Sequence, residues 1–120
     1  MAKRGRRRER LVAPSSDYTD GQGNVLTLRG SLTPAARREY AQTLSGGDGR
    51  ASRTREDAWQ RAVELLFERL AVRWVIAGAP IHRQRELLMR FRAASTEERA
   101  WIRVALREHC AENFPDVSAP

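Results

Sequence analysis

The feature that most constrains the fold is an apolar stripe in the middle of the chain. Between residues 55 and 77 its members recur at intervals of three or four residues, as Trp59, Val63, Leu66, Leu70 and Trp74. This spacing places the side chains on one face of an α-helix. Val72, Val75 and Ile76 add apolar side chains on other faces, so we predict a central helix over 55–77 that other elements surround. Gly78-Ala79-Pro80 ends this helix, because proline cannot continue one.

A β-hairpin is expected near the amino terminus, at about 17–30. Two glycines and an asparagine within residues 21–24 separate two short β-prone runs, a pattern typical of a hairpin turn. Alternation along the second run puts Leu26 and Leu28 on one side of the strand, so we expect them to reach the core. A two-stranded hairpin is marginal in water and must pack on other elements.

Three further helices have clear boundary signals. Thr33-Pro34 suits the N-cap and first position of a helix. A second helix is expected over 81–94, where an apolar face continues after the proline. Ser95 and Glu98 then form a capping-box pattern that starts a last helix over 96–113. Its expected core stripe consists of Ile102, Ala105, Leu106, His109 and Cys110.

These elements together predict a mainly α protein. We expect a small helical bundle of about four helices, with a short N-terminal β-hairpin and a disordered basic arm. The single helical domain is expected to span 17–115, with a flexible loop at 45–54. The segments outside it, 1–16 and 116–120, are expected to be a disordered arm and a disordered tail.

Positive charge is concentrated at the amino terminus. The chain holds 22 Lys and Arg against 15 Asp and Glu, a net charge of +7. Six of these basic residues lie in the first ten positions beside one acid, Glu9, so the other 110 residues hold 16 basic and 14 acidic side chains. Every basic residue except Lys3 is arginine, a bias that GC-rich coding sequence produces, and arginine identity is therefore weak evidence of phosphate recognition. That bias does not explain the clustering.

The basic cluster favours a nucleic-acid partner. A flexible arm can follow phosphates or enter a minor groove, and the arginines that would do so are Arg4, Arg6, Arg7, Arg8 and Arg10. The predicted helices on either side of Gly78-Ala79-Pro80 also have the outline of a helix-turn-helix. The second helix would then face the groove through Arg83, Arg85, Arg90 and Arg92. The alternatives are a solubilising tail and a solvated arginine face.

Enzymatic chemistry has little support in the sequence. The chain has two histidines and one cysteine, and the adjacent His109 and Cys110 diverge by about 100° on a helix. The usual paired spacing of a zinc site is absent, and neither Gly21-x-Gly23 nor the glycines after Ser45 continue into a nucleotide-binding pattern. We expect no enzyme activity, metal, cofactor or small-molecule substrate.

The resulting hypothesis is a non-enzymatic nucleic-acid-binding accessory or regulatory protein, with DNA preferred to RNA as the expected partner. The alternative is a homodimeric protein–protein interaction module with no nucleic-acid role, in which Trp101, at the margin of its helix stripe, serves as an interface anchor. No apolar run approaches the length of a membrane span. The basic segment is not followed by the apolar stretch of an export signal, so cytoplasmic residence is expected and no membrane partner.

Overall fold

Two β-hairpins and four helices alternate along the described part of the chain, so that each hairpin is followed by two helices. The structure is a computed structural model that describes residues 14–45, 55–117 and 119–120. Its elements are β1 (Ser15–Thr19), β2 (Val25–Arg29), α2 (Pro34–Leu44), α3 (Arg55–Leu70), β3 (Ala71–Ile76), β4 (Ala79–Ile81), α4 (Gln84–Arg92) and α5 (Thr96–Asn113).

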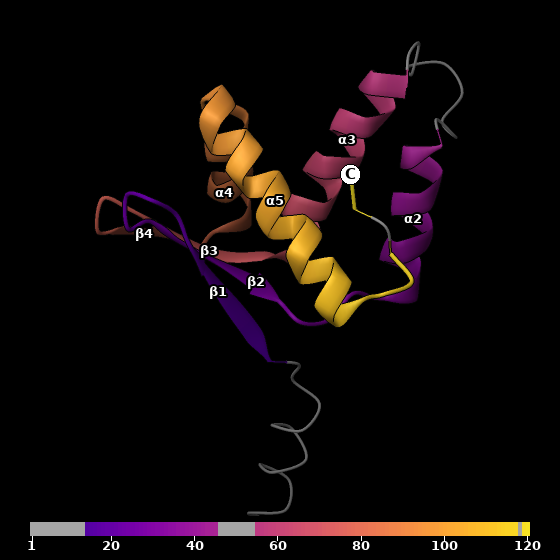
Figure 1. The fold of residues 1–120 in the computed structure, drawn as a ribbon, viewed down its shortest axis with the longest axis horizontal. Coiled ribbons are helices and arrows are strands. Elements are labelled where there is room, and N and C mark those ends of the chain that lie inside the picture. Colours follow the sequence, from indigo (N-terminus) through magenta and orange to yellow (C-terminus); the bar gives the residue numbers. More distant parts are fainter. Residues whose placement is uncertain (1–13, 46–54, 118) are drawn as a thin grey trace, which may run out of the picture.

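The four strands form one antiparallel sheet in the order β1-β2-β3-β4. The helices lie on one side of this sheet, and α5 crosses over it (Figure 1). The architecture therefore has two layers, one of helices and one of strands. None of the helices in the described ranges combines the length and the apolarity of a membrane-spanning segment.

One cross-strand row of side chains joins the sheet to the helices. In this row Tyr18 is opposite Leu26, Leu26 is opposite Trp74, and Trp74 is opposite Ile81. Leu26 and Trp74 are buried, while Tyr18 and Ile81 at the two edges pack against the core from partly buried positions. Side chains alternate across a strand, so the row that includes Thr27 and Arg73 lies on the opposite face.

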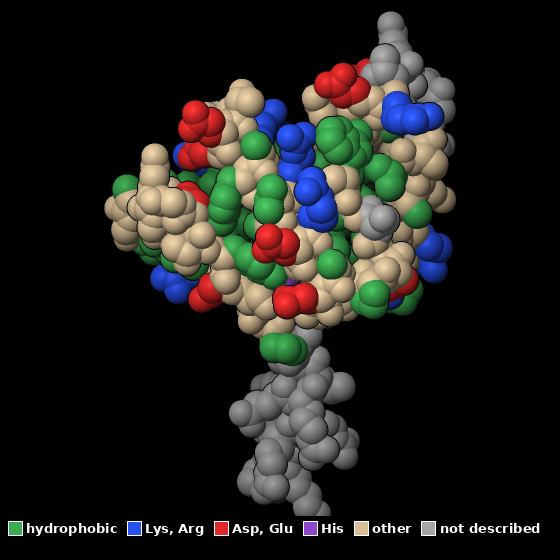
Figure 2. Space-filling view, viewed as in Figure 1, with side chains coloured by type: hydrophobic (Ala, Val, Ile, Leu, Met, Phe, Trp, Pro, Cys, Tyr) green, Lys and Arg blue, Asp and Glu red, His purple; other side chains and the backbone are tan. Residues whose placement is uncertain are grey.

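Aromatic rings connect the central strand to the helices above it. Phe67 on α3 contacts Trp74 on β3 edge to face, with ring centroids 5.8 Å apart, and stacks on Phe91 of α4 at 4.7 Å. All three side chains are buried, and burial of each such ring contributes about 2–3 kcal/mol. Nearer the surface, a hollow separates α3 from α5 (Figure 2).

Several sequence predictions are confirmed. The hairpin forms with Leu26 and Leu28 fully buried. Thr33 caps α2 by accepting a hydrogen bond from the Ala36 amide at 3.1 Å, and α5 begins with the predicted capping box. The expected core stripe of α5 is also buried: Ile102, Ala105, Leu106, His109 and Cys110.

The predicted helix over 55–77 is wrong in its second part. Helix α3 ends at Leu70, and residues 71–76 form strand β3, which pairs with β2. The β-branched residues that we assigned to extra faces of a helix, Val72, Val75 and Ile76, are favoured in strands. Trp74 faces the core in either conformation, so the helical spacing of the stripe gave no warning.

The mainly α fold class is likewise contradicted, because a four-stranded antiparallel sheet forms a complete layer of this α/β structure. Strand β1 begins at Ser15, inside the segment expected to be disordered, and Val117 in the expected tail is buried. The remainder of the expected arm and most of the expected flexible loop at 45–54 lie outside the described residues.

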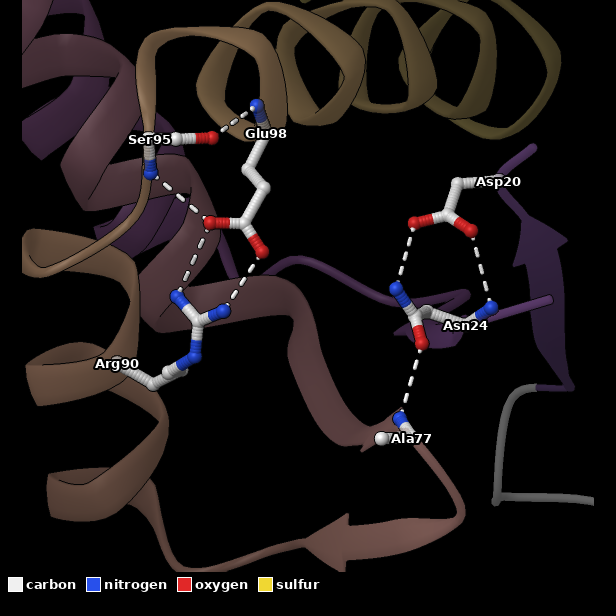
Figure 3. Close-up of polar contacts among 6 residues, drawn as sticks. All are labelled: Asp20, Asn24, Ala77, Arg90, Ser95 and Glu98. Carbon is white, nitrogen blue, oxygen red and sulfur yellow. Dashed lines mark hydrogen bonds and ion pairs between the residues drawn. The ribbon is translucent and has the colours of Figure 1, made fainter. Parts of the chain in front are cut away.

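The two hairpin turns are bonded to each other. The Asn24 side chain donates to an Asp20 carboxylate oxygen at 3.0 Å and accepts a hydrogen bond from the Ala77 amide at 3.0 Å (Figure 3). Ala77 and Gly78 form the two-residue turn between β3 and β4, and both have positive φ, at 50° and 81°. A two-residue hairpin turn with two left-handed residues has type I′ character, and an alanine in the first position is strained.

We predict that Ala77→Gly stabilises the protein by about 0.5–1 kcal/mol, because glycine removes the left-handed strain at some cost in unfolded-chain entropy. Urea unfolding measures the change. The matched control is Ala79→Gly, in an exposed position of β4, which should lower stability by about 0.5–1 kcal/mol. Equal destabilisation by both variants would contradict the strained turn.

Candidate nucleic-acid interface

The helix-free face of the sheet bears exposed arginines. Asp17 is opposite Thr27 and Thr27 is opposite Arg73, so these side chains form one row on that face. The Thr27 hydroxyl donates to the Asp17 carboxylate at 2.7 Å. Arg29, two residues after Thr27, is exposed, as is Arg73. Neither guanidinium has a carboxylate partner among the described residues.

Two more exposed arginines lie where α4 begins, next to the edge of the sheet. Arg83 occupies the N-cap position of α4 and makes no side-chain capping bond. Arg85 is in the first turn of the same helix. Both are exposed, and neither is ion-paired with any residue that the structure describes. An arginine is a poor N-cap, since it has no side-chain acceptor for the free amides.

The start of α4 and the end of β2 border the same surface hollow, of about 480 Å³. Arg29, His82 and Gln84 all line it. Arg69 and Glu39, which also line the hollow, form an ion pair at 2.8 Å. The hollow therefore brings Arg29 to the same depression as Gln84 of α4, although β2 and α4 are far apart in the sequence. Arg83 and Arg85, on either side of Gln84 in the sequence, do not line it.

The other two sequence-predicted arginines of α4 are engaged in ion pairs. Arg90 donates to both carboxylate oxygens of Glu98, at 2.6 and 3.3 Å (Figure 3). Arg92 does the same with Glu64, at 2.8 and 3.3 Å. Arg90 also lies 5.1 Å from the centroid of the Trp74 ring. These contacts join α4 to α5, α3 and the sheet. Arg90 and Arg92 thus have carboxylate partners, whereas Arg83 and Arg85 have none in the part of the chain that the structure describes.

The helix-turn-helix interpretation is wrong, for the same reason as the long helix. Gly78 lies in the turn of the β3–β4 hairpin, and Ala79 and Pro80 belong to β4. Strand β3 therefore precedes this segment where a helix was expected, whereas the helix predicted after it forms as α4, over Gln84–Arg92. The predicted arm residues Arg4, Arg6, Arg7, Arg8 and Arg10 lie outside the described residues.

Sequence reasoning missed Arg29 and Arg73. Arg29 had a usable signal, because alternation along β2 puts it on the side opposite Leu26 and Leu28. Arg73 had none, since residue 73 was assigned to a helix, and its neighbour Thr27 comes from a strand far away in the sequence.

The two residues with the most reactive side chains, His109 and Cys110, are buried in α5. The His109 Nε2 atom lies 2.7 Å from the Arg29 carbonyl oxygen, which can only accept, so Nε2 carries the proton. Nδ1 then accepts from the Tyr18 hydroxyl at 2.9 Å. Asn113 lies beside the same ring nitrogen at 3.2 Å. This network ties α5 to β1 and β2, which is a structural role.

No group of three or more His, Cys, Asp or Glu side chains that could hold a metal ion occurs in the described ranges. Trp101, the predicted interface anchor, is partly buried and packs against the core. The large apolar side chains that are most exposed among the described residues are Met89 on α4, at 61%, and Val104 on α5, at 44%.

Comparisons with protein-family models, with curated proteins and with solved structures find no match to this chain.

The Arg90–Glu98 pair gives a prediction about acid stability. The hydrogen bond from Arg90, and after it the Ser95 amide, hold the pKa of Glu98 below its ordinary value of 4.5. A carboxylate with a depressed native pKa stabilises the fold above its unfolded pKa, and this contribution is lost as the pH falls through the native pKa. Between pH 7 and pH 3, unfolding free energies should therefore decrease less in Glu98→Gln than in the unaltered protein.

The matched control for this measurement is Glu97→Gln. Glu97 is also in the first turn of α5, but it has no ion-pair partner among the described residues. Its variant should keep the acid dependence of the unaltered protein. Parallel pH profiles for Glu98→Gln and the unaltered protein would contradict the assignment.

Burial also predicts an unreactive thiol. Desolvation raises the pKa of Cys110 to about 11, and the residue is 1% exposed. At pH 7.5, a disulfide reagent should label the native protein at least about 100-fold more slowly than the urea-unfolded chain, because the thiolate is the reacting form. Absorbance of the released thiol follows the reaction, and rapid native labelling would show that the α5 stripe opens.

Proposed function

We propose that this protein is a non-enzymatic nucleic-acid-binding accessory protein that contacts the phosphates of duplex DNA. The contacting surface, named the sheet surface here, consists of Arg29, Arg73, Arg83 and Arg85. It acts together with the basic residues of the first ten positions. Guanidinium groups donate paired hydrogen bonds to phosphate oxygens, which makes exposed arginines suited to this task.

The observation that supports the proposal is that some arginines are paired with carboxylates and others are not. One group is joined to carboxylates and connects helices to one another or to the carboxyl-terminal segment; it includes Arg37, Arg69, Arg90 and Arg92. The four of the sheet surface have no such partner among the described residues, and they come from β2, β3 and the start of α4. Their charge is thus available to an external anion. Other exposed arginines lie on helices, as Arg38 on α2, Arg55 on α3 and Arg99 on α5.

Strand β1 begins beside this surface, because Ser15, its first residue, is opposite Arg29. The six basic residues at positions 3–10 precede Ser15 by five to twelve positions in the sequence. The same DNA backbone can therefore be contacted by both groups. Asp17 is an acidic side chain on the same face of the sheet, and its carboxylate accepts a hydrogen bond from the Thr27 hydroxyl.

Phosphate contacts predict strong salt dependence and weak sequence preference. Each arginine that neutralises a phosphate contributes about 0.9 to the slope of log affinity against log salt. The binding of a fluorescent duplex of random sequence should therefore weaken steeply with salt, as measured by anisotropy. The double variant Arg73→Gln, Arg85→Gln should reduce the slope by about 2, and removal of residues 1–10 should reduce it further.

The control is the double variant Arg38→Gln, Arg55→Gln, which removes the same charge from helices outside the sheet surface. It should leave the slope within the error of the unaltered protein. Absence of duplex binding by the intact chain at low salt would reject the proposal. An equal loss in the control would show that net charge, and not this surface, governs binding.

A further inference from the structure

A second cluster of arginines lies in the hollow between α3 and α5, away from the sheet surface. The hollow has a volume of about 290 Å³, and its walls come from α3, α4 and α5. Figure 2 shows basic side chains in this notch, next to apolar ones. Val63 and Phe91 supply apolar lining, Trp59 lies on the α3 side, and Arg99 and Arg103 lie on the α5 side.

Two of the three arginines that line the hollow, Arg99 and Arg103, are positioned by aromatic rings. The guanidinium carbon of Arg103 lies 5.1 Å from the centroid of the Trp59 ring, and that of Arg99 lies 5.6 Å from the centroid of Phe91. Arg99 also donates to the Arg92 carbonyl oxygen at 2.6 Å. Stacking on a ring holds a guanidinium in place without neutralising its charge.

Arg103 has an unmet hydrogen-bonding requirement. Its Nε atom is buried and has no acceptor within the described structure. No carboxylate among the described residues is paired with its guanidinium. Buried donors without partners are rare in native proteins and call for an explanation. An anion in the hollow would be reached by the terminal amino groups of this guanidinium, which are not paired with a carboxylate within the described ranges.

One carboxylate of the hollow is committed to an arginine outside it. Glu64 lines the hollow, but both of its oxygens are bonded to Arg92. Asp57 and Arg61 also line the hollow, and each has an interaction within the structure. Arg99 and Arg103 line it beside the partly buried Trp59, and within the described ranges neither forms an ion pair with a carboxylate.

From this arrangement we infer that the hollow binds one nucleotide unit. Arg99 and Arg103 contact its phosphate, and Trp59 and Val63 contact its base. A ligand that joins an anion to a planar ring uses both halves of the lining, whereas an acidic peptide side chain uses the arginines alone. A charged groove with aromatic side chains is the usual means of binding single-stranded nucleic acid. The nucleotide comes from a single strand or from a free mononucleotide, because bases stacked inside a duplex cannot reach Trp59.

This site is independent of the sheet surface, so the two can be tested separately. In the intact protein, the indole N–H signal of Trp59, assigned by comparison with Trp59→Phe, is followed by NMR. The probes are a nucleoside monophosphate, a short oligothymidylate, the random duplex and inorganic phosphate. We expect the Trp59 signal to shift with the first or second probe; a shift with the monophosphate identifies free nucleotide as a ligand, and a shift with the oligonucleotide alone identifies a single strand.

Substitutions test which side chains of the hollow contribute to nucleotide binding. In titration calorimetry with the nucleotide probe that shifts Trp59, Arg103→Gln should weaken binding at least about fivefold. Trp59→Leu, which lacks the indole signal and is therefore measured by calorimetry alone, should do the same through loss of base stacking. Arg103→Lys keeps the charge and loses the planar fork, so its affinity should fall between those of Arg103→Gln and the unaltered protein. The matched control is Arg107→Gln, one turn further along α5, which should bind as the unaltered protein does. Circular dichroism confirms that each variant is folded.

Two results would overturn the inference. One is duplex binding through the sheet surface with no shift of Trp59 by either nucleotide probe, which would leave the proposed function intact. The other is inorganic phosphate binding as tightly as the monophosphate, which would show that the base makes no contact. A Trp59 shift without duplex binding would have the opposite meaning: it would support the nucleotide site and reject the proposed function.

Discussion

The fold depends on burying one face of a single sheet. Leu26 and Trp74 lie side by side in the middle of that face, and a sheet with one apolar face must pack against another layer. Helix α3 runs directly into β3, and α4 follows β4 after two residues. These short connections position α3 and α4 against the apolar face of the sheet. There Phe67 contacts Trp74, and Phe91 stacks on Phe67.

The same constraint explains which parts of the fold were predictable from sequence. Helix starts are local, so the Thr33 cap and the Ser95–Glu98 capping box were recognised correctly. The first hairpin was also local, because its turn and its two strands are contiguous. Strand β3 was not, since its conformation is stabilised by pairing with β2 across two intervening helices. Residues 71–76 contain side chains compatible with helix and with strand, and only that distant pairing decides between them.

Candidate sites followed the same rule. Arg83 and Arg85 were identified because they are close together in the sequence. The exposed arginines of the strands, Arg29 and Arg73, were not identified, since their shared face is defined only by the pairing of β2 with β3. Trp59 was assigned to the core from its place in the apolar stripe, and the structure leaves it partly buried beside Arg103, a residue of another helix. Charge counting treated the body of the protein as nearly balanced, but it did not show which charges are paired: within the described ranges Arg90 and Arg92 are in ion pairs, whereas Arg29 and Arg73 are not.

The Asn24–Ala77 bond has a consequence for any molecule that binds the helix-free face. Each hairpin end is anchored to the other, so the strands at this edge of the molecule are restrained before a partner arrives. A molecule that binds this face then has to order little of the backbone, so the entropic cost of its binding is smaller. The buried Asn24 side chain thereby helps to preorganise the sheet that carries Arg29 and Arg73.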